Sequence, residues 1–99
     1  MLNIETSGNA GKITITLQGR LDTVTAPDLE QALQKVIPEA SELTLDFTNL
    51  AYISSAGLRV LLSAQKQMNK LGRMRLLHVS APVLEIFEVT GFTDILTIE

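Results

Sequence analysis

Two adjacent serines, Ser54 and Ser55, are the side chains of this sequence that most clearly suggest chemistry. They follow residues 43–47, which alternate apolar and polar side chains as a half-buried strand does. They precede residues 58–71, whose apolar positions recur at helical spacing. A serine where a helix begins can cap free backbone N–H groups, or it can present its hydroxyl at a helix end that favours negative charge. The residues alone leave both roles open.

Most classes of enzyme lack the residues that they need here. The chain has no cysteine, which excludes disulfides, thiol catalysis and cysteine-based metal sites. Neither of the two common glycine-rich phosphate-binding loops is present in the sequence. A serine hydrolase with a nucleophile elbow needs a glycine where Ile53 stands, and His78, the only histidine, is expected to be a structural residue of a strand. We therefore predict that the protein is not an enzyme and binds no metal or cofactor.

Asp22, Tyr52 and Arg59 are the other side chains for which we consider a function. Asp22 follows a predicted strand in a loop that we expect to be exposed, where a substitution costs little folding energy. Its carboxylate either satisfies local backbone N–H groups or takes part in function. Tyr52, the only tyrosine, is expected to pack at the end of a strand. Arg59 lies in the first turns of a predicted helix, where the helix dipole disfavours a cation, so its position needs another explanation.

Length and composition indicate one compact domain. The 99 residues, 45% apolar and 19% charged, suffice for a single core, so residues 1–99 are expected to form one domain. The sequence contains no apolar run of membrane-spanning length and no start typical of a signal peptide, which predicts a soluble cytoplasmic protein that binds no membrane. The net charge of −3 gives no reason to expect nucleic acid as a partner. Between Phe47 and Leu84, however, the sequence has no acidic residue and five cations.

Five short segments have the composition of strands, namely residues 2–4, 13–17, 43–47, 74–79 and 95–98. A short loop joins the first two, which are expected to pair antiparallel. The later strands alternate with helices, which indicates parallel pairing, and the fourth is expected to be covered on both faces. This order predicts an α/β fold with a mixed sheet.

Three amphipathic segments separate the later strands. The first begins near Thr25, which with Asp28 resembles a capping box, and ends at residue 38; before it, residues 19–23 are expected to leave the sheet. The second runs from the serines to Gly72, and the third occupies residues 80–91. The apolar face of the second helix is predicted to consist of Leu58, Leu61, Leu62, Met68 and Leu71.

Residues 45–58, Leu-Asp-Phe-Thr-Asn-Leu-Ala-Tyr-Ile-Ser-Ser-Ala-Gly-Leu, resemble the signature of the STAS domain of bacterial anti-sigma factor antagonists. Other stretches match the same family in the same order. Residues 19–22, Gly-Arg-Leu-Asp, resemble its Gly-x-Leu-Asp after the second strand. Residues 80–83 and 87–92 resemble its late helix and its closing turn. The resemblance covers nearly the whole chain.

The resemblance implies a fold and a mechanism. STAS domains have a mixed sheet of four to five strands, with helices packed mainly on one face. Members of this kind are not enzymes and act by partner switching. The unphosphorylated antagonist binds an anti-sigma factor that is also a serine kinase, which releases the sigma factor. The kinase then phosphorylates a serine at the start of a helix and so ends the interaction, and a phosphatase resets the switch.

Carried over to this sequence, the resemblance makes Ser55, two residues before Gly57, the phosphoacceptor. In well-studied members an aspartate precedes the acceptor and a serine or threonine often follows it, whereas Ser54 and Ala56 stand here, so Ser54 is a candidate second site. Asp22 matches an aspartate that helps to engage the kinase. The residues expected to contact the partner are Asp22, Thr23, Ser54, Ser55, Ala56, Gly57 and Arg59.

An alternative within the same family is a module that binds a small anion or a nucleotide at residues 54–57 and has no sigma-factor output. Saturable stabilisation by phosphate or nucleotide alone would distinguish it, because a partner switch requires a kinase protein. In either case we expect a monomer or a weak dimer.

Overall fold

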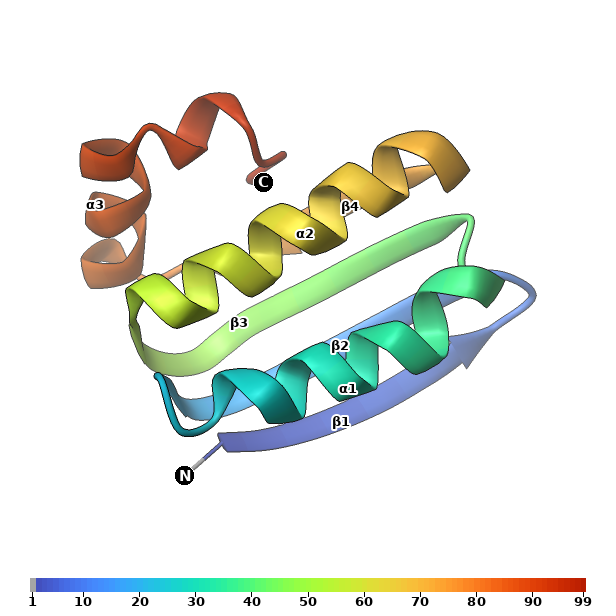
Figure 1. The fold of residues 1–99 in the computed structure, drawn as a ribbon, viewed down its shortest axis with the longest axis horizontal. Coiled ribbons are helices and arrows are strands. Elements are labelled where there is room, and N and C mark those ends of the chain that lie inside the picture. Colours follow the sequence, from blue (N-terminus) through green and yellow to red (C-terminus); the bar gives the residue numbers. More distant parts are fainter. Residues whose placement is uncertain (1) are drawn as a thin grey trace.

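The computed structural model describes residues 2–99, which form an α/β domain with one sheet (Figure 1). The strands are β1 (Leu2–Asn9), β2 (Lys12–Leu21), β3 (Glu42–Ile53) and β4 (Arg73–Leu77). The helices are α1 (Ala26–Val36), α2 (Ser55–Leu71) and α3 (Ala81–Thr90), with 3-10 helices η1 (Ile37–Glu39) and η2 (Phe92–Asp94). None of the helices in residues 2–99 combines the length and the apolar character that a membrane span needs.

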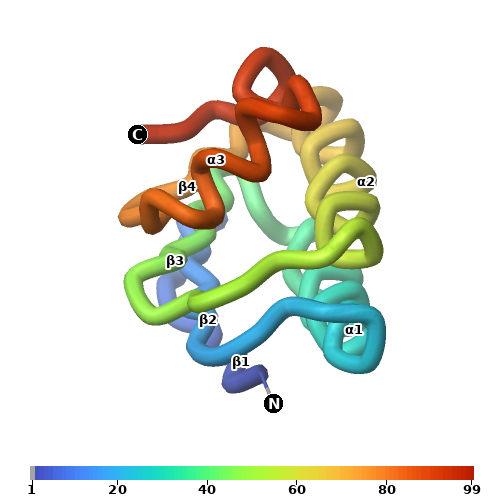
Figure 2. The backbone as a smooth tube through the Cα atoms, turned by 90° about the vertical axis from the view of Figure 1, so that its left-hand side faces the viewer, coloured from blue at the N-terminus to red at the C-terminus, as the bar shows by residue number. Residues whose placement is uncertain are grey.

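The four strands lie in the order β1-β2-β3-β4. β1 and β2 pair antiparallel as a hairpin, whereas β2 with β3 and β3 with β4 pair parallel. Helix α1 connects β2 to β3, helix α2 connects β3 to β4, and both lie on the same side of the sheet (Figure 2). Both helices therefore begin at the same edge of the sheet, where the parallel strands β2 and β3 end. The predicted mixed α/β sheet is confirmed.

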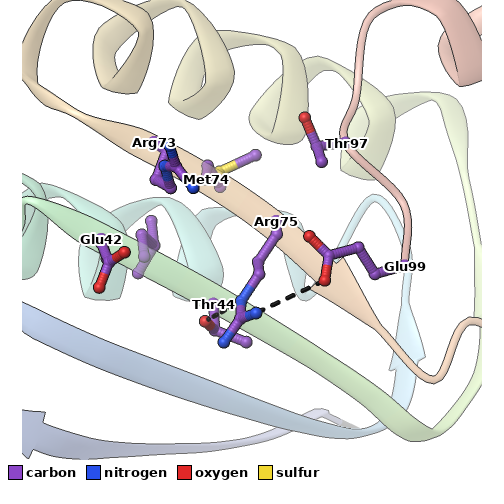
Figure 3. Close-up of a pocket in the computed structure, with 8 residues that line it drawn as sticks. Glu42, Thr44, Arg73, Met74, Arg75, Thr97 and Glu99 are labelled. Atoms are coloured by element: carbon purple, nitrogen blue, oxygen red, sulfur yellow. Dashed lines mark hydrogen bonds and ion pairs between the residues drawn. The ribbon is translucent and has the colours of Figure 1, made fainter.

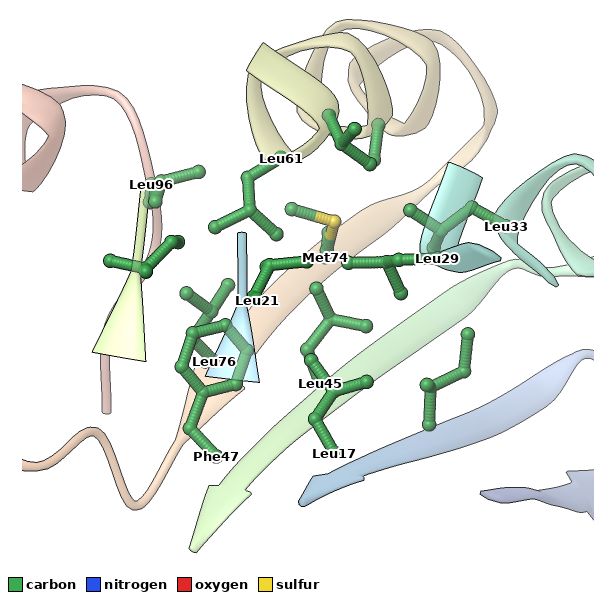
Figure 4. Close-up of a cluster of buried hydrophobic side chains, with 14 of the residues drawn as sticks. Leu17, Leu21, Leu29, Leu33, Leu45, Phe47, Leu61, Met74, Leu76 and Leu96 are labelled. Atoms are coloured by element: carbon green, nitrogen blue, oxygen red, sulfur yellow. The ribbon is translucent and has the colours of Figure 1, made fainter. Parts of the chain in front are cut away.

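The hydrophobic core fills the space between the sheet and the helices (Figure 4). Leu17, Leu45 and Leu76 enter it from the strands, and Leu29 and Leu61 enter it from α1 and α2; all five are fully buried. Burial of each such side chain stabilises the fold by about 1.5–3 kcal/mol. The alternate strand positions are polar and face away from the helices, namely Thr14, Thr16, Thr44, Asp46 and Arg75.

Strands β2 and β3 continue beyond their predicted ends, so the prediction that residues 19–23 leave the sheet is wrong for residues 19–21. Leu21 still pairs with Ile53. Two shifts in the register between β2 and β3 make this continuation possible. The buried residues of β3 after Leu45 are Phe47, Leu50 and Ile53, a spacing of three that regular strand alternation does not predict.

Strand β4 is covered on one face, so the prediction of two covered faces is wrong. Met74 and Leu76 are buried, whereas Arg73 and Arg75 at the alternate positions are exposed. The reason is that α1 and α2 pack on one side of the sheet only (Figure 2). β4 ends at Leu77, and the next residue, His78, has a φ of 59°, which a strand cannot contain.

The predicted last strand, residues 95–98, is also wrong. Residues 92–94 form η2, and only one parallel bridge joins Leu76 to Ile98. The N–H of Leu76 donates to the Thr97 carbonyl at 2.8 Å, and the Leu76 carbonyl accepts from the N–H of Glu99 at 2.9 Å. Leu96 is buried in the core, so the apolar residues that suggested a strand close the core beside β4 instead.

Helix α2 buries Leu58, Leu61 and Met68 as predicted, but Leu62 is only half-buried and Leu71 is 51% exposed. Leu71 is the last residue of the helix, and the chain turns into β4 directly after it. The predicted helix end is confirmed, because the N–H of Gly72 donates to the Met68 carbonyl at 2.8 Å.

Candidate functional site

The two serines have different environments. Ser54 is the N-cap of α2 in extended conformation, and its hydroxyl accepts a long hydrogen bond of 3.5 Å from the N–H of Gly57. Its own N–H donates to the Leu21 carbonyl at 2.8 Å. Ser54 is half-buried, whereas Ser55, the first residue of α2, is exposed. The capping role and the displayed hydroxyl, which the sequence left open, thus fall to Ser54 and Ser55 respectively.

Gly57 fixes the position of these serines. A Cβ at this residue would lie 2.7 Å from Cγ of Leu21 and 2.9 Å from Cγ1 of Ile53, closer than carbon atoms can approach. Only a glycine lets the first turn of α2 pack this closely against the ends of β2 and β3. Gly57 is buried, so the role that its surroundings define is packing, and its contact with a partner stays a prediction.

Asp22 organises the loop between β2 and α1. Its Oδ1 accepts hydrogen bonds from the N–H groups of Val24 and Thr25, each at 3.0 Å. The N–H of Thr25 is the largest cause that lowers the pKa of the Asp22 carboxyl below its ordinary value. The loop is exposed at Thr23 and Val24, as expected, but Asp22 itself is half-buried, and its hydrogen bonds argue against the small structural cost that we expected for replacing it. Of its two predicted roles, the structure demonstrates the local one.

The capping box predicted from Thr25 and Asp28 does not form. The Thr25 side chain makes no capping bond to α1. Its hydroxyl instead donates to the Arg20 carbonyl and accepts from the N–H of Asp22, both at 2.8 Å, and the residue is buried. Asp22 accepts the hydrogen bonds of the N–H groups of Val24 and Thr25. The Thr25 hydroxyl therefore bonds to Arg20, at the end of β2, instead of capping α1.

Arg20 and Tyr52 form a pair that the sequence analysis missed. They lie opposite each other in the register of β2 and β3, and the guanidinium carbon of Arg20 lies 4.3 Å from the ring centroid of Tyr52. Nε of Arg20 also lies 3.9 Å from Oδ2 of Asp22. Tyr52 packs at the strand end, as predicted, and is 38% exposed. The pairing depends on the register shifts, so no sequence spacing could have indicated it.

A shallow groove of about 230 Å³ separates the first turns of α1 and α2. Its lining includes Thr23, Ala26, Glu30, Ala56, Arg59 and Val60. Three predicted site residues, Thr23, Ala56 and Arg59, therefore share one surface. Arg59 is exposed, and within residues 2–99 no carboxylate forms an ion pair with it. The first turn of α2 has no acidic side chain, so its dipole and Arg59 together favour an anion there.

A second hollow, of about 340 Å³, lies on the open face of the sheet beside β4 (Figure 3). Arg75 crosses it: its Nε donates to Oγ1 of Thr44 at 3.1 Å, and its Nη1 lies 3.5 Å from Oε1 of Glu99. This arginine is already paired within the chain, unlike Arg59. The hollow is lined by none of the predicted site residues.

His78 lies directly after β4 rather than within a strand. Its Nδ1 lies 3.1 Å from Oδ1 of Asp46 and 3.0 Å from Oγ1 of Thr48. The Thr48 hydroxyl bond is the main cause that lowers the pKa of Asp46. Both neighbours share one ring nitrogen, whereas a hydroxyl–histidine–carboxylate relay uses the two nitrogens separately. The cluster is a structural polar group of the open face.

Residues 4–97 match the family model described as Mlab, STAS domain. The chain belongs to the STAS domain family. This STAS domain is 33% identical over 89 residues to the anti-sigma-B factor antagonist of Listeria monocytogenes, a match that covers 88% of this chain and 78% of that protein. It is 26% identical over 98 residues to the anti-sigma-B factor antagonist of Bacillus subtilis, covering 98% and 90%. The family predicted from these sequence stretches is confirmed.

Solved structures share the fold of this STAS domain. An anti-sigma factor antagonist from Mycobacterium paratuberculosis superimposes with a TM-score of 0.90 at 21% identity, covering 99% of this chain and 85% of that one. SpoIIAA of Bacillus in its phosphorylated form gives a TM-score of 0.77 at 18% identity, covering 98% and 91%. At these identities the likeness concerns the fold, which agrees with the four-stranded mixed sheet described above.

Proposed function

We propose that this STAS domain is an anti-sigma factor antagonist that works by partner switching. In its unphosphorylated form it binds an anti-sigma factor that is also a serine kinase. The kinase phosphorylates Ser55, which ends the binding, and a phosphatase removes the phosphate. The observation that carries this proposal is the exposed hydroxyl of Ser55 on the first turn of α2, beside Arg59 and the groove.

Three features favour Ser55 over Ser54 as the acceptor. Ser54 is half-buried, its hydroxyl faces the N–H of Gly57, and its backbone is tied to Leu21. A kinase that modified Ser54 would have to break the cap of α2, which typically stabilises a helix by about 1 kcal/mol. Ser55 is exposed, and the cap of α2 is formed by Ser54, so a phosphate on Ser55 leaves the cap intact.

The groove supports a protein partner rather than a small ligand. Its volume of about 230 Å³ is below the range of about 300–1,000 Å³ that is usual for small-molecule pockets. The exposed residues Thr23, Ser55 and Arg59 lie on the loop before α1 and on the first turns of α2, an open surface of the kind that a protein partner covers. Relatives that match nearly the whole chain are anti-sigma-B factor antagonists. A nucleotide-binding module would require an enclosed pocket at the same place.

The test begins with Ser55→Ala as bait in a pull-down from lysate of the source organism. A variant that cannot be phosphorylated should retain its partner, and we expect to recover an ATPase related to histidine kinases. That ATPase, purified and supplied with ATP, should add one phosphate to the wild-type protein, which mass spectrometry should place on Ser55.

The controls are Ser54→Ala and Ser63→Ala, since Ser63 is an exposed serine two turns further along α2. Both variants should still accept phosphate at Ser55. Stoichiometric modification of Ser55→Ala would refute the assignment of the acceptor. Stabilisation by phosphate or nucleotide alone, with no ATPase recovered, would favour the small-ligand module.

A further inference from the structure

One apolar side chain in the loop before α1 is almost fully exposed to solvent. Val24 is 82% exposed, in the loop between β2 and α1. Outward positions of such turns usually carry polar residues, because an apolar side chain in water adds nothing to the stability of the fold. We propose that Val24 is an apolar docking residue for the anti-sigma factor kinase, an inference that rests on the function proposed above.

Hydrogen bonds on its inner side hold the loop in one conformation. The Asp22 carboxylate accepts from the N–H of Val24 at 3.0 Å, and the Asp22 carbonyl accepts from the N–H of Ala26 at 2.8 Å. Thr25 turns inward and is buried, so Val24 cannot exchange places with it. A valine also has few side-chain conformations. A partner that covers Val24 therefore has little conformational freedom to remove, which favours binding.

The loop borders the groove that adjoins Ser55. Thr23, the residue before Val24, lines this groove together with Ala56, the residue after Ser55. Ala26 and Val60 add apolar area to the same groove. Val24 and Ser55 are thus each the chain neighbour of a residue that lines this groove, so a kinase that covers Ser55 and the groove also reaches the loop of Val24.

The charges around this surface indicate the chemistry of the partner. Arg59 is exposed, and no carboxylate of residues 2–99 pairs with it. Arg20, on the other side of Asp22, is already paired with Asp22 and lies over the ring of Tyr52. A complementary kinase surface therefore has an apolar pocket for Val24 and a carboxylate beside it that faces Arg59.

Val89 provides an internal comparison. It is 81% exposed on α3, where it lines a separate hollow with Pro82 and Ile86, away from α1 (Figure 1). Single exposed apolar residues are common on proteins, so exposure by itself does not identify a docking residue. The two valines are equally exposed, but Val24 directly follows a residue of the groove beside the first turn of α2, whereas Val89 lines another hollow.

The test measures the affinity of the purified ATPase that is recovered with Ser55→Ala, by calorimetric titration without ATP. Val24→Asp and Val24→Lys should each raise Kd by about tenfold or more, whereas Val89→Asp should change it by less than about twofold. A loss with both signs of charge indicates that an apolar contact is lost. Val24→Thr, which keeps the shape, should cause a smaller rise in Kd, and an unchanged thermal midpoint shows that the loop is intact.

Binding of Val24→Asp within twofold of wild type, with Ser55 still phosphorylated, overturns the docking role and leaves the proposed function standing. An equal loss with Val89→Asp also overturns it, because the effect would then be unspecific. If the bait recovers no kinase, the proposed function fails and the docking role fails with it.

Discussion

Asp22 is a single carboxylate with a structural task and a proposed functional one. It accepts hydrogen bonds from two N–H groups of the loop that carries Val24, and it lies 3.9 Å from Nε of Arg20. A carboxylate that accepts backbone N–H bonds is stabilised in its charged form, which explains its lowered pKa. The same bonds orient the surface that we propose the kinase binds. Asp22 therefore contributes to partner binding partly through the shape of the loop.

We expect Asp22→Ala to lower the thermal midpoint at pH 7 by about 5 °C, because it leaves two N–H groups without their acceptor. Asp94→Ala, on η2, is the control and should change the thermal midpoint little, because Asp94 is exposed. Differential scanning calorimetry of the two variants and the wild type measures the difference. An unchanged midpoint for Asp22→Ala would show that water replaces the carboxylate at no cost.

The destabilisation caused by Asp22→Ala should depend on pH in a defined direction. The pKa of Asp22 is lower in the folded chain than its ordinary value of 3.8, so the ionised carboxylate stabilises the fold above about pH 4. This contribution disappears as the pH falls through the pKa of the folded state. Asp46, whose pKa is also lowered, is present in both proteins and cancels. The gap between wild-type and variant midpoints should therefore narrow from pH 7 to pH 3.

At the scale of elements, the contact between α2 and the ends of β2 and β3 sets where Ser55 lies. Gly57→Ala would gain about 1 kcal/mol of helix propensity. Its Cβ would, however, lie 2.7 Å from Cγ of Leu21, and such overpacking costs about 1–3 kcal/mol. We expect a net loss of stability in chemical denaturation, together with slower phosphorylation of Ser55 because the first turn must shift.

A double-mutant cycle with Leu21→Ala identifies the cause. Removing the leucine side chain makes room for the new methyl group, so the double variant should be less destabilised than the sum of the two single changes. Strict additivity would mean that Gly57→Ala acts elsewhere than at Leu21.

The elements also show what a sequence can predict here. Strand 43–47 followed from spacing, because local alternation records which side faces the core, and the helix starts followed from residues typical of a first turn. The burial of Leu50 and Ile53 did not follow, since their spacing of three from Phe47 requires register shifts that depend on pairing with β2. The same shifts bring Arg20 onto Tyr52. The sequence placed two serines at a helix start, but burial and hydrogen bonding, which need the whole fold, separated Ser54 from Ser55.

At the scale of the whole molecule, the fold should tolerate a phosphate on Ser55. Ser55 and Arg59 are four residues apart on α2, so they share one helix face. No acidic side chain occupies the first turn of α2. A phosphate of about −2 charge therefore gains from the helix dipole and from Arg59, by roughly 0.3–1 kcal/mol each when exposed. Leu58, Leu61 and Met68, all buried, hold α2 against the sheet independently of that charge.

The switch should consequently be an event at the surface and not the unfolding of a helix. New charge and bulk at an interface cost several kcal/mol, enough to dissociate a micromolar complex. Phosphorylated protein, or Ser55→Asp as an approximate mimic, should keep its circular dichroism and thermal midpoint but lose the kinase. Ser63→Asp, which places the same charge on an exposed site further along α2, should keep its circular dichroism and its thermal midpoint and should still bind the kinase. A midpoint that falls by many degrees on phosphorylation would mean that the switch works by local unfolding.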